Sequence, residues 1–286
     1  MKSIKYFIQF IIILIMFLIF KIVGINLASY ISGKIVSIIG PYFRSKNLIK
    51  SNILKALPNL SPNEVEIISK KMWNNYGRIL AEYIFIKDFR ISNLKNNIEI
   101  VGQEVLERIK QNNEPVIFVS GHFSNFELMA MQIEKSNIDL ATVYRPLNNK
   151  FLNFIMERIR KKYICKNQVK KGISGTKQLL SFFKNKTSIA LMIDQRVSQG
   201  IKSNFFNQEA FTTTIPAQFV KKFNCKVVPI YIERVTGANF KLIIQEPLIF
   251  SNDESIESIT LKLNSQLEKL ILKNPGQWIW SHDRWR

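Results

Sequence analysis

Apolar and polar residues follow three different patterns along the chain. From Phe7 to Ile25 nearly every residue is apolar, and a run of this length is just sufficient to span a bilayer as one helix. Residues 30–92 repeat apolar side chains at helical spacing. From residue 97 onwards, short apolar runs alternate with amphipathic stretches, which predicts strands that alternate with helices.

The helical region contains a clear helix start. In the string Ser61–Glu64 (Ser-Pro-Asn-Glu), a capping serine precedes a proline, and proline is favoured at the first helical position. We expect a helix from this point through Tyr83.

The remainder of the chain predicts an α/β fold with a mainly parallel central sheet flanked by helices, because strands and helices alternate. The expected strands are 98–101, 116–120, 140–144, 188–193, 227–234 and 240–245. The expected helices are 103–111, 127–134, 148–162, 175–184, 216–223 and 255–272. We therefore divide the chain into a membrane anchor at residues 1–28, a helical N-terminal region at 29–96 and an α/β domain at 97–286.

The apolar N-terminal segment has two interpretations. Lysine precedes the apolar run, as in a secretory signal peptide. However, Asn26–Ser29 is a poor cleavage site, and Lys21 interrupts the apolar run near its end, so a retained anchor is favoured. Basic residues follow the anchor and tend to stay cytoplasmic, which places the body of the protein on the cytoplasmic face. Whether the anchor spans the bilayer or lies in one leaflet is left open.

The charge of the chain indicates anionic partners. Lys and Arg number 41 against 21 Asp and Glu, which gives a formal net charge of +20. Nucleic acid, anionic lipid head groups and acidic proteins all qualify, and charge alone does not choose among them. Cys165 and Cys225 match no metal-binding spacing, and two reduced thiols suit a cytosol-facing domain.

His122 is the strongest candidate for catalysis and one of only two histidines. It stands in Gly121–Glu127 (Gly-His-Phe-Ser-Asn-Phe-Glu), between a predicted strand and a predicted helix. An imidazole here, followed by the carboxylate of Glu127, suits a general base and the acid that orients its tautomer. The same string fits the capping box Ser-x-x-Glu, in which Ser124 and Glu127 would only satisfy backbone amides. A metal site is a weaker interpretation, because no second histidine lies at helical spacing.

Two more predicted strands end in polar residues. Arg145 follows the strand at 140–144, and Asp194 and Gln195 follow the strand at 188–193. Ligands collect at the carboxyl edge of a parallel sheet, where these residues would join His122. A guanidinium can hold a phosphate with two hydrogen bonds. The alternatives are an ordinary surface arginine and an aspartate that caps a turn.

Two amphipathic stretches have no assigned chemistry. The tryptophan-rich segment 278–286, which contains His282, could pack on the core, lie at a membrane interface or contact substrate. We expect His282 to be structural. The basic helix at 148–162 has an apolar face that includes Phe151 and Phe154, so it could lie against an anionic membrane or dock an acidic protein.

Taken together and in this order, four strings resemble the lipid A biosynthesis acyltransferases of the lauroyl/myristoyl type, which act late in lipopolysaccharide assembly. They are His122 to Glu127 (the His-x4-acid motif of glycerolipid-type acyltransferases), Tyr144-Arg145-Pro146 with Asn149, Asp194-Gln195 with Phe205-Phe206, and Trp280-Ser281-His282-Asp283-Arg284. The family commonly has Gly at the positions of Ser124 and Asn207, and Pro at the position of Glu209. Asn tolerates left-handed backbone nearly as well as Gly, so we expect the loop at Asn207 to keep its shape.

The resemblance implies a glycerolipid-acyltransferase-like fold and an O-acyltransferase. The reaction implied is transfer of a fatty acyl group from acyl-carrier protein to a hydroxyl of a lipid A precursor of the Kdo-lipid IVA type. By resemblance, the catalytic residues are His122 and Glu127, and the substrate-binding residues are Arg145, Asn149, Asp194 and Gln195. No metal or cofactor is implied, since the acyl group arrives on the phosphopantetheine of acyl-carrier protein.

The implied partners are acyl-carrier protein, a phosphorylated glycolipid acceptor and the anionic membrane surface, but not nucleic acid. The implied location is the cytoplasmic face of the bacterial inner membrane. Two alternatives stay open. The acceptor could be a lysophospholipid, an ornithine lipid or a glycosylated phospholipid. A basic, membrane-anchored protein that only binds anions would instead show salt-sensitive binding, but it would need none of the motifs at the strand ends.

Overall fold

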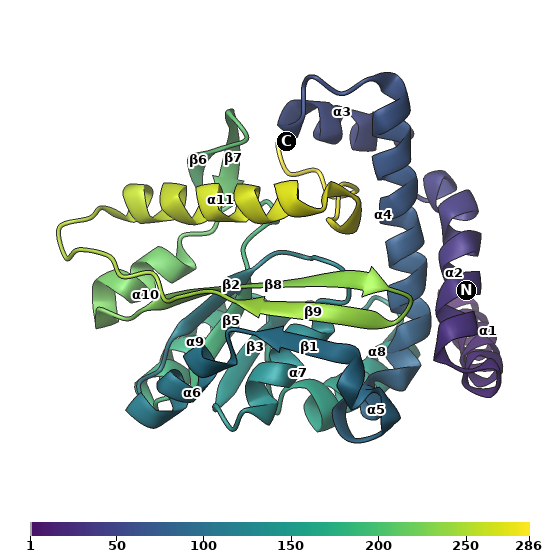
Figure 1. Ribbon diagram of the computed structural model, residues 1–286, viewed down its shortest axis with the longest axis horizontal. Coiled ribbons are helices and arrows are strands. Elements are labelled where there is room, and N and C mark those ends of the chain that lie inside the picture. Colours follow the sequence, from purple (N-terminus) through teal and green to yellow (C-terminus); the bar gives the residue numbers. More distant parts are fainter. Residues whose placement is uncertain (1) are drawn as a thin grey trace.

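A seven-stranded sheet forms the centre of the computed structural model, which describes residues 2–286 (Figure 1). The strand order is β1-β9-β8-β2-β5-β3-β4. The strands are β1 (Ile98–Val101), β2 (Ile117–Ser120), β3 (Leu140–Tyr144), β4 (Asn167–Lys170), β5 (Ser188–Met192), β8 (Val227–Thr236) and β9 (Asn239–Ile244). Every neighbouring pair is parallel except β8 and β9, so the predicted mainly parallel sheet is confirmed.

Helices cover both faces of the sheet, which explains why its central strand β2 is buried at all four positions. In Figure 1, α11 lies over one side of the sheet and α7 lies on the other. The helices of this part are α6 (Gln103–Asn112), α7 (Glu127–Lys135), α8 (Lys150–Ile159), α9 (Ile173–Lys184), α10 (Ile215–Phe223) and α11 (Ile256–Lys273). The six expected helices are confirmed, with ends that differ by a few residues.

Three strands were not expected from the sequence. Strand β4 buries only Val169 fully, so it presents no apolar run. Strands β6 (Ile201–Phe205) and β7 (Gln208–Thr212) form a separate antiparallel hairpin with a partly exposed, polar sequence. The two residues that join them, Phe206 and Asn207, have φ values of 53° and 56°. The positive φ of Asn207 agrees with the expectation that asparagine replaces glycine there.

The chain before the sheet is helical, as predicted. It contains α1 (Lys2–Val23), α2 (Ile25–Ile39), α3 (Lys46–Ala56), α4 (Pro62–Glu82) and the short α5 (Ile86–Ile91). Helix α4 begins at the predicted proline, with a complete capping box between Ser61 and Glu64. Helix α1 is the one helix among residues 2–286 that is long and apolar enough to cross a membrane, and Gly24 (φ 80°) separates it from α2.

Helices α2 and α4 pack backbone against backbone. The Ser32 hydroxyl donates to the carbonyl oxygen of Gly77 at 2.6 Å. A methyl group on Gly77 would lie 2.2 Å from the Ser32 carbonyl oxygen, which is closer than any real contact. Only glycine therefore allows this approach, which holds α2 against the rest of the molecule.

Replacing Gly77 with alanine should push α2 and α4 apart and lower the free energy of unfolding by about 1–3 kcal/mol, as expected for overpacking. Thermal unfolding of the detergent-solubilised protein measures the loss. Lys70→Ala, on the exposed face of the same helix, is the matched control and should have little effect. Equal stability of the Gly77→Ala and control variants would show that the two helices are free to separate.

Candidate active site

Two adjacent strands, β2 and β5, bring His122 and Asp194 into contact. The imidazole Nδ1 lies 2.8 Å from one carboxylate oxygen of Asp194, and the backbone N–H of His122 donates to the other oxygen at 2.7 Å. Strand β3, on the other side of β5, carries Arg145 just beyond its end. The expectation that these three residues share the carboxyl edge of the sheet is therefore confirmed.

The carboxylate of Asp194 is fully buried and accepts a third hydrogen bond, from the indole Nε1 of Trp278 at 2.9 Å. Burial by itself raises the pKa of Asp194. The neighbouring His122 and the hydrogen bonds outweigh burial and hold the pKa below its usual value. Asp194 is therefore ionised, and it can accept a hydrogen bond from the protonated Nδ1 of His122.

The other imidazole nitrogen of His122, Nε2, is left with its lone pair when Nδ1 donates to Asp194. The side chain is 21% exposed and lines a cavity, with its ring packed edge-on against Phe126. Burial alone would lower the pKa of His122. The Asp194 carboxylate and the charge of Glu127 outweigh it, so the pKa lies above the usual value for imidazole. His122 thus has the tautomer and the basicity of a general base.

Glu127 does not bind the imidazole, so the expected His122–Glu127 hydrogen bond is wrong. Glu127 begins α7 and accepts from the guanidinium of Arg160, whose Nε lies 3.0 Å away and whose Nη2 is also bonded to it. Arg160 starts a π-helical turn (Arg160–Ile164, η4) at the end of α8, which directs its side chain toward α7. The sequence therefore identified the histidine but paired it with the wrong acid, since Asp194 holds the imidazole.

The capping box that was the alternative interpretation of Ser124 and Glu127 does not form either. Helix α7 has no side-chain cap, and the buried Ser124 hydroxyl has no partner within the part of the chain described. Ser124 instead adopts a φ of 42°, and its N–H donates to the carbonyl oxygen of Gln277 at 2.9 Å. A left-handed residue cannot cap a helix as an extended one does, and this backbone conformation is one that glycine adopts without strain.

A second buried carboxylate, Glu82, fixes the loop that follows His122. Glu82 is fully buried and pairs with the guanidinium of Arg234 from β8. It also accepts from the Ser29 hydroxyl at 2.8 Å and from the side-chain amide of Asn125 at 3.0 Å. This one group therefore connects α2, α4 and β8 to the catalytic loop.

The C-terminal tryptophan-rich segment forms hydrogen bonds with residues of the site. Trp278 donates to Asp194, as described above. His282 lines the cavity, and its Nε2 accepts a hydrogen bond from the backbone N–H of Arg196 at 2.9 Å. The buried Arg284 donates to Phe211 and Thr212 of the hairpin. The structure thus gives His282 a structural hydrogen bond, while sequence reasoning missed the role of Trp278.

The cavity that His122 faces has a volume of about 560 Å³ and extends between the sheet and helices α7, α8 and α9. Its inner lining is mostly apolar and includes Phe118, Met129, Ile133, Leu179 and Ile230. Arg145, Gln195, Glu127 and Arg160 also line it. Asn149 does not; it caps α8, and its side-chain amide donates to the Tyr6 carbonyl oxygen at 2.8 Å.

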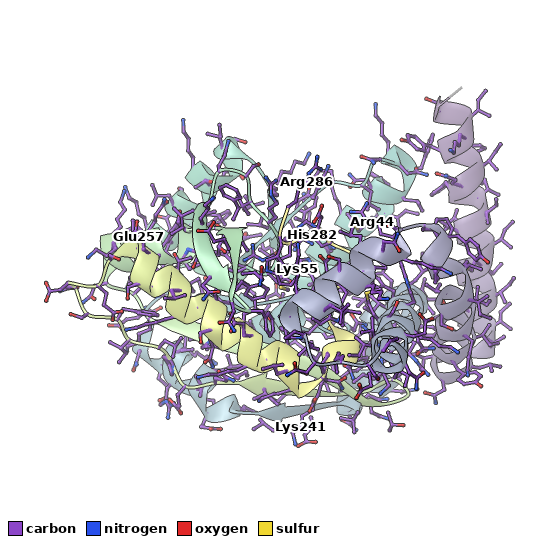
Figure 2. The ribbon with its side chains drawn as sticks, turned by 90° about the horizontal axis from the view of Figure 1, so that it is seen from above. Arg44, Lys55, Lys241, Glu257, His282 and Arg286 are labelled. Atoms are coloured by element: carbon purple, nitrogen blue, oxygen red, sulfur yellow. The ribbon has the colours of Figure 1, made fainter. Side chains whose placement is uncertain are left out.

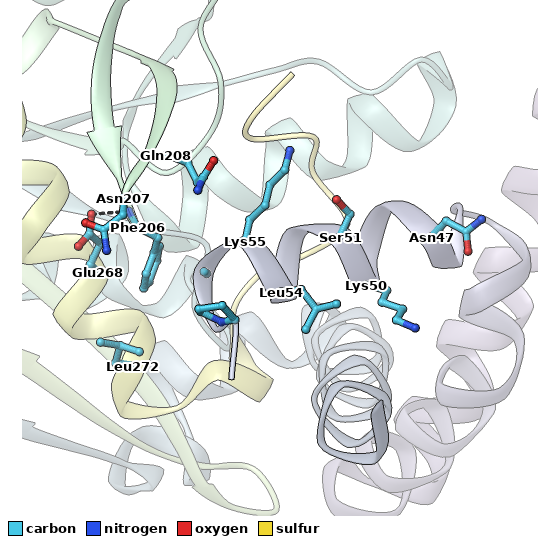
Figure 3. Close-up of a pocket in the computed structure, with 12 residues that line it drawn as sticks. Asn47, Lys50, Ser51, Leu54, Lys55, Phe206, Asn207, Gln208, Glu268 and Leu272 are labelled. Atoms are coloured by element: carbon cyan, nitrogen blue, oxygen red, sulfur yellow. Dashed lines mark hydrogen bonds between the residues drawn. The ribbon is translucent and has the colours of Figure 1, made fainter. Parts of the chain in front are cut away.

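A larger hollow of about 820 Å³ lies away from this chemistry (Figure 3). It is an open groove between α3, the β6–β7 turn and α11, where Glu268 accepts from the backbone N–H of Phe206 at 2.7 Å. It contains neither His122 nor Asp194. Across residues 2–286, no group of histidine, cysteine, aspartate or glutamate side chains is arranged to hold a metal ion.

A histidine held by a buried aspartate beside a largely apolar cavity suits an enzyme that acts on acyl groups, and the comparison with known families identifies this protein as an acyltransferase. Over residues 1–286 the chain belongs to the bacterial lipid A biosynthesis acyltransferase family. It therefore acts in acyl transfer in lipid A biosynthesis.

Characterised relatives are distant but cover most of the chain. The palmitoleoyltransferase of lipid A biosynthesis from Escherichia coli K12 is 21% identical over 248 residues, which are 85% of this chain and 79% of that protein. The lauroyltransferase from the same organism is 23% identical over 252 residues, 85% and 79% of the two chains. The crystal structure of the 1-acyl-sn-glycerophosphate acyltransferase PlsC from Thermotoga maritima superposes with a TM-score of 0.43 at 12% identity, over 89% of this chain and 98% of that one.

Trp278→Phe should reduce kcat by about tenfold or more, because a hydrogen bond to a charged group is worth about 1.5–3 kcal/mol. The control is Trp280→Phe, since the Trp280 indole donates to the Pro275 carbonyl oxygen instead of to Asp194. Both rates are measured in the purified enzyme at saturating substrate. Equal rates for the two variants would contradict a role for Trp278 in holding Asp194.

Proposed function

We propose that this acyltransferase moves a fatty acyl group from acyl-carrier protein to a hydroxyl of a lipid A precursor of the Kdo-lipid IVA type, with His122 as the general base. The observation that carries the proposal is the orientation of His122. Its Nδ1 is held by Asp194, and its side chain faces the apolar cavity. Such a cavity suits an alkyl chain, and the base at its edge suits a hydroxyl nucleophile.

The reaction proceeds by direct attack. Nε2 of His122 takes the proton of the acceptor hydroxyl as its oxygen attacks the thioester carbonyl, and Asp194 stabilises the imidazolium that forms. When the tetrahedral intermediate collapses, the carbon–sulfur bond breaks and the sulfur leaves as a thiolate. The imidazolium then returns its proton to that sulfur, which leaves an ester and a free thiol.

The remaining polar groups have supporting roles. The N–H groups of Phe123 and Ser124 are already bonded to carbonyl oxygens, so they are poorly placed to stabilise an oxyanion. Arg145 and Arg160 line the cavity and supply positive charge for the oxyanion and for substrate phosphates. Glu127 keeps Arg160 in place, and Gln195 contacts substrate. Asn149 fixes α8 and the loop that carries Arg145.

The charge of the protein suits the proposed partners. Acyl-carrier protein is acidic and the acceptor is a phosphorylated glycolipid, and both are attracted by a chain of net charge +20. Lys170 and Lys171 line the cavity, where they can meet either partner. We place the catalytic body at the cytoplasmic face of the inner membrane, because basic residues follow the apolar α1.

The decisive assay uses purified enzyme with acyl-carrier-protein thioesters of several chain lengths and a tetra-acylated lipid A precursor. His122→Ala should abolish transfer, and Asp194→Asn should lower kcat about 10³- to 10⁴-fold because the imidazole takes the wrong tautomer. Glu127→Ala should abolish turnover by releasing Arg160. Unfolding temperatures of the variants separate loss of chemistry from loss of folding. Substantial turnover by His122→Ala would contradict the proposal that His122 is the general base.

The acceptor is tested in the same assay by offering a lysophospholipid in place of the lipid A precursor. We expect acylation of the lipid A precursor at least an order of magnitude faster. Preference for the lysophospholipid would favour the other membrane-lipid acceptors.

The value of kcat/KM should rise with pH and level off once His122 is neutral. Burial opposes protonation of His122, but Asp194 outweighs it, so the midpoint should lie above the ordinary imidazole pKa of about 6.5. Activity is therefore lost as the pH falls through the raised pKa. In Asp194→Asn the residual activity should titrate at a lower pH. An unchanged midpoint would mean that another group controls the rate.

A further inference from the structure

Helix α1 is attached to the body of the protein at its N-terminal end. The side-chain amide of Asn149, at the start of α8, donates to the carbonyl oxygen of Tyr6 at 2.8 Å. The rings of Phe7 and Phe10 both pack against Phe151, each with a centroid distance of 5.6 Å. The contact joins an early turn of α1 to α8, far from the point where α1 meets α2.

The same helix is attached again near its C-terminal end. Phe20 is buried, Lys21 forms an ion pair of 2.5 Å with Asp88, and its ammonium lies over the ring of Phe85. From Tyr6 to Lys21 the helix rises about 22 Å, at about 1.5 Å per residue. The two points of attachment are therefore separated along α1 by most of the hydrocarbon thickness of about 30 Å.

This attachment is incompatible with an α1 that crosses the bilayer. A spanning α1 would draw α8 and the α5 region into the hydrocarbon, with charged residues such as Asp88 and Arg158. Charged side chains at that depth are strongly disfavoured. A helix that lies along the surface of one leaflet keeps its outer face in lipid and its inner face on the protein.

The outer face of α1 is continuous with other exposed apolar surface. Its exposed side chains include Ile4, Ile8, Ile11, Ile12, Ile15, Leu18, Ile19 and Ile22. Helix α2 and the turn after it add Ile35, Ile38, Tyr42 and Phe43. Leu147 in the loop before α8 and Phe151 and Phe154 in α8 also contribute. Exposed apolar surface of this extent marks a partner or a membrane.

The arrangement of α1 and α2 defines a face of the molecule. In Figure 1, α1 is seen nearly end-on beside α2, whereas Figure 2 shows α1 along its length, at the same side of the molecule. The two helices therefore lie at a large angle to each other along one side of the molecule.

The charge around this face selects a lipid surface over a protein. No Asp or Glu occurs in the chain before Glu64, whereas lysine and arginine are present throughout that stretch. Lys34, Arg44, Lys46 and Lys50 follow or accompany the exposed side chains of α2. Apolar surface flanked mainly by basic charge is suited to a leaflet of anionic lipids.

We propose that the protein is monotopic, with α1, the outer face of α2 and the start of α8 embedded together in one anionic leaflet. Leu147 both belongs to this face and lines the catalytic cavity, next to Arg145. The mouth of the cavity therefore opens at the level of the lipid head groups, where a lipid substrate can reach His122 without leaving its leaflet. The proposal concerns the position of the chain and does not depend on the identity of the acceptor.

Labelling of single cysteines tests the topology in the full-length protein. Ser3→Cys marks the start of α1, and Glu257→Cys marks the far side of the body (Figure 2), in a chain with Cys165→Ala and Cys225→Ser. A membrane-impermeant maleimide is added to spheroplasts and, separately, to inverted membrane vesicles. Both cysteines should react in the vesicles and neither in spheroplasts. Reaction of Ser3→Cys from the opposite side to Glu257→Cys would overturn the proposal.

Depth measurements test the embedded face. Spin labels are placed at Phe43 and Phe154, which are 76% and 66% exposed, and at Ile249, a control that is 78% exposed elsewhere on the body. In vesicles of phosphatidylglycerol and phosphatidylethanolamine, the first two labels should collide more with oxygen than with a water-soluble nickel chelate. The control should show the reverse. Equal behaviour of all three labels, or exclusion of both reagents by a second copy of the chain, would contradict the proposal.

Discussion

The buried carboxylate of Asp194 is the group on which the site depends. It accepts two hydrogen bonds from His122 and one from Trp278, so three segments of the chain meet at one charge. A buried carboxylate without donors costs several kcal/mol, which means that the fold and the catalytic geometry support each other. The same contact that stabilises the ion sets the tautomer of the base, so the site is organised before substrate arrives.

The order of strands and helices is readable from the sequence because it depends on local periodicity. Apolar runs predicted six of the seven strands of the sheet, and the carboxyl-edge rule placed His122, Arg145 and Asp194 together. The polar strand β4 and the hairpin of β6 and β7 were not predicted, because a short, half-exposed strand has no distinctive sequence pattern. Their existence depends on neighbours that the local sequence does not specify.

The sequence did not predict which buried polar groups pair with one another. Glu127 was the nearest acid in the chain, yet the imidazole is held by Asp194, which lies 72 positions away. Trp278 is 84 positions from Asp194 and carried no signal beyond a tryptophan-rich composition. Each buried acid has a distant partner: Arg160 for Glu127, Arg234 for Glu82. Such pairs are chosen by the folded geometry. The resemblance to a family pointed to His122, Glu127 and Asp194 without their contacts, and it did not point to Arg160, Glu82 or Arg234.

The place of Trp278 in the chain has a consequence for biosynthesis. During translation α1 emerges first and can reach the membrane while the sheet is still being made. Trp278 leaves the ribosome only after every strand described, since β9 ends at Ile244. The nascent chain therefore reaches the lipid surface long before it can hold Asp194 and His122 in register. If the proposed mechanism holds, the site is therefore completed only after the chain has reached the membrane.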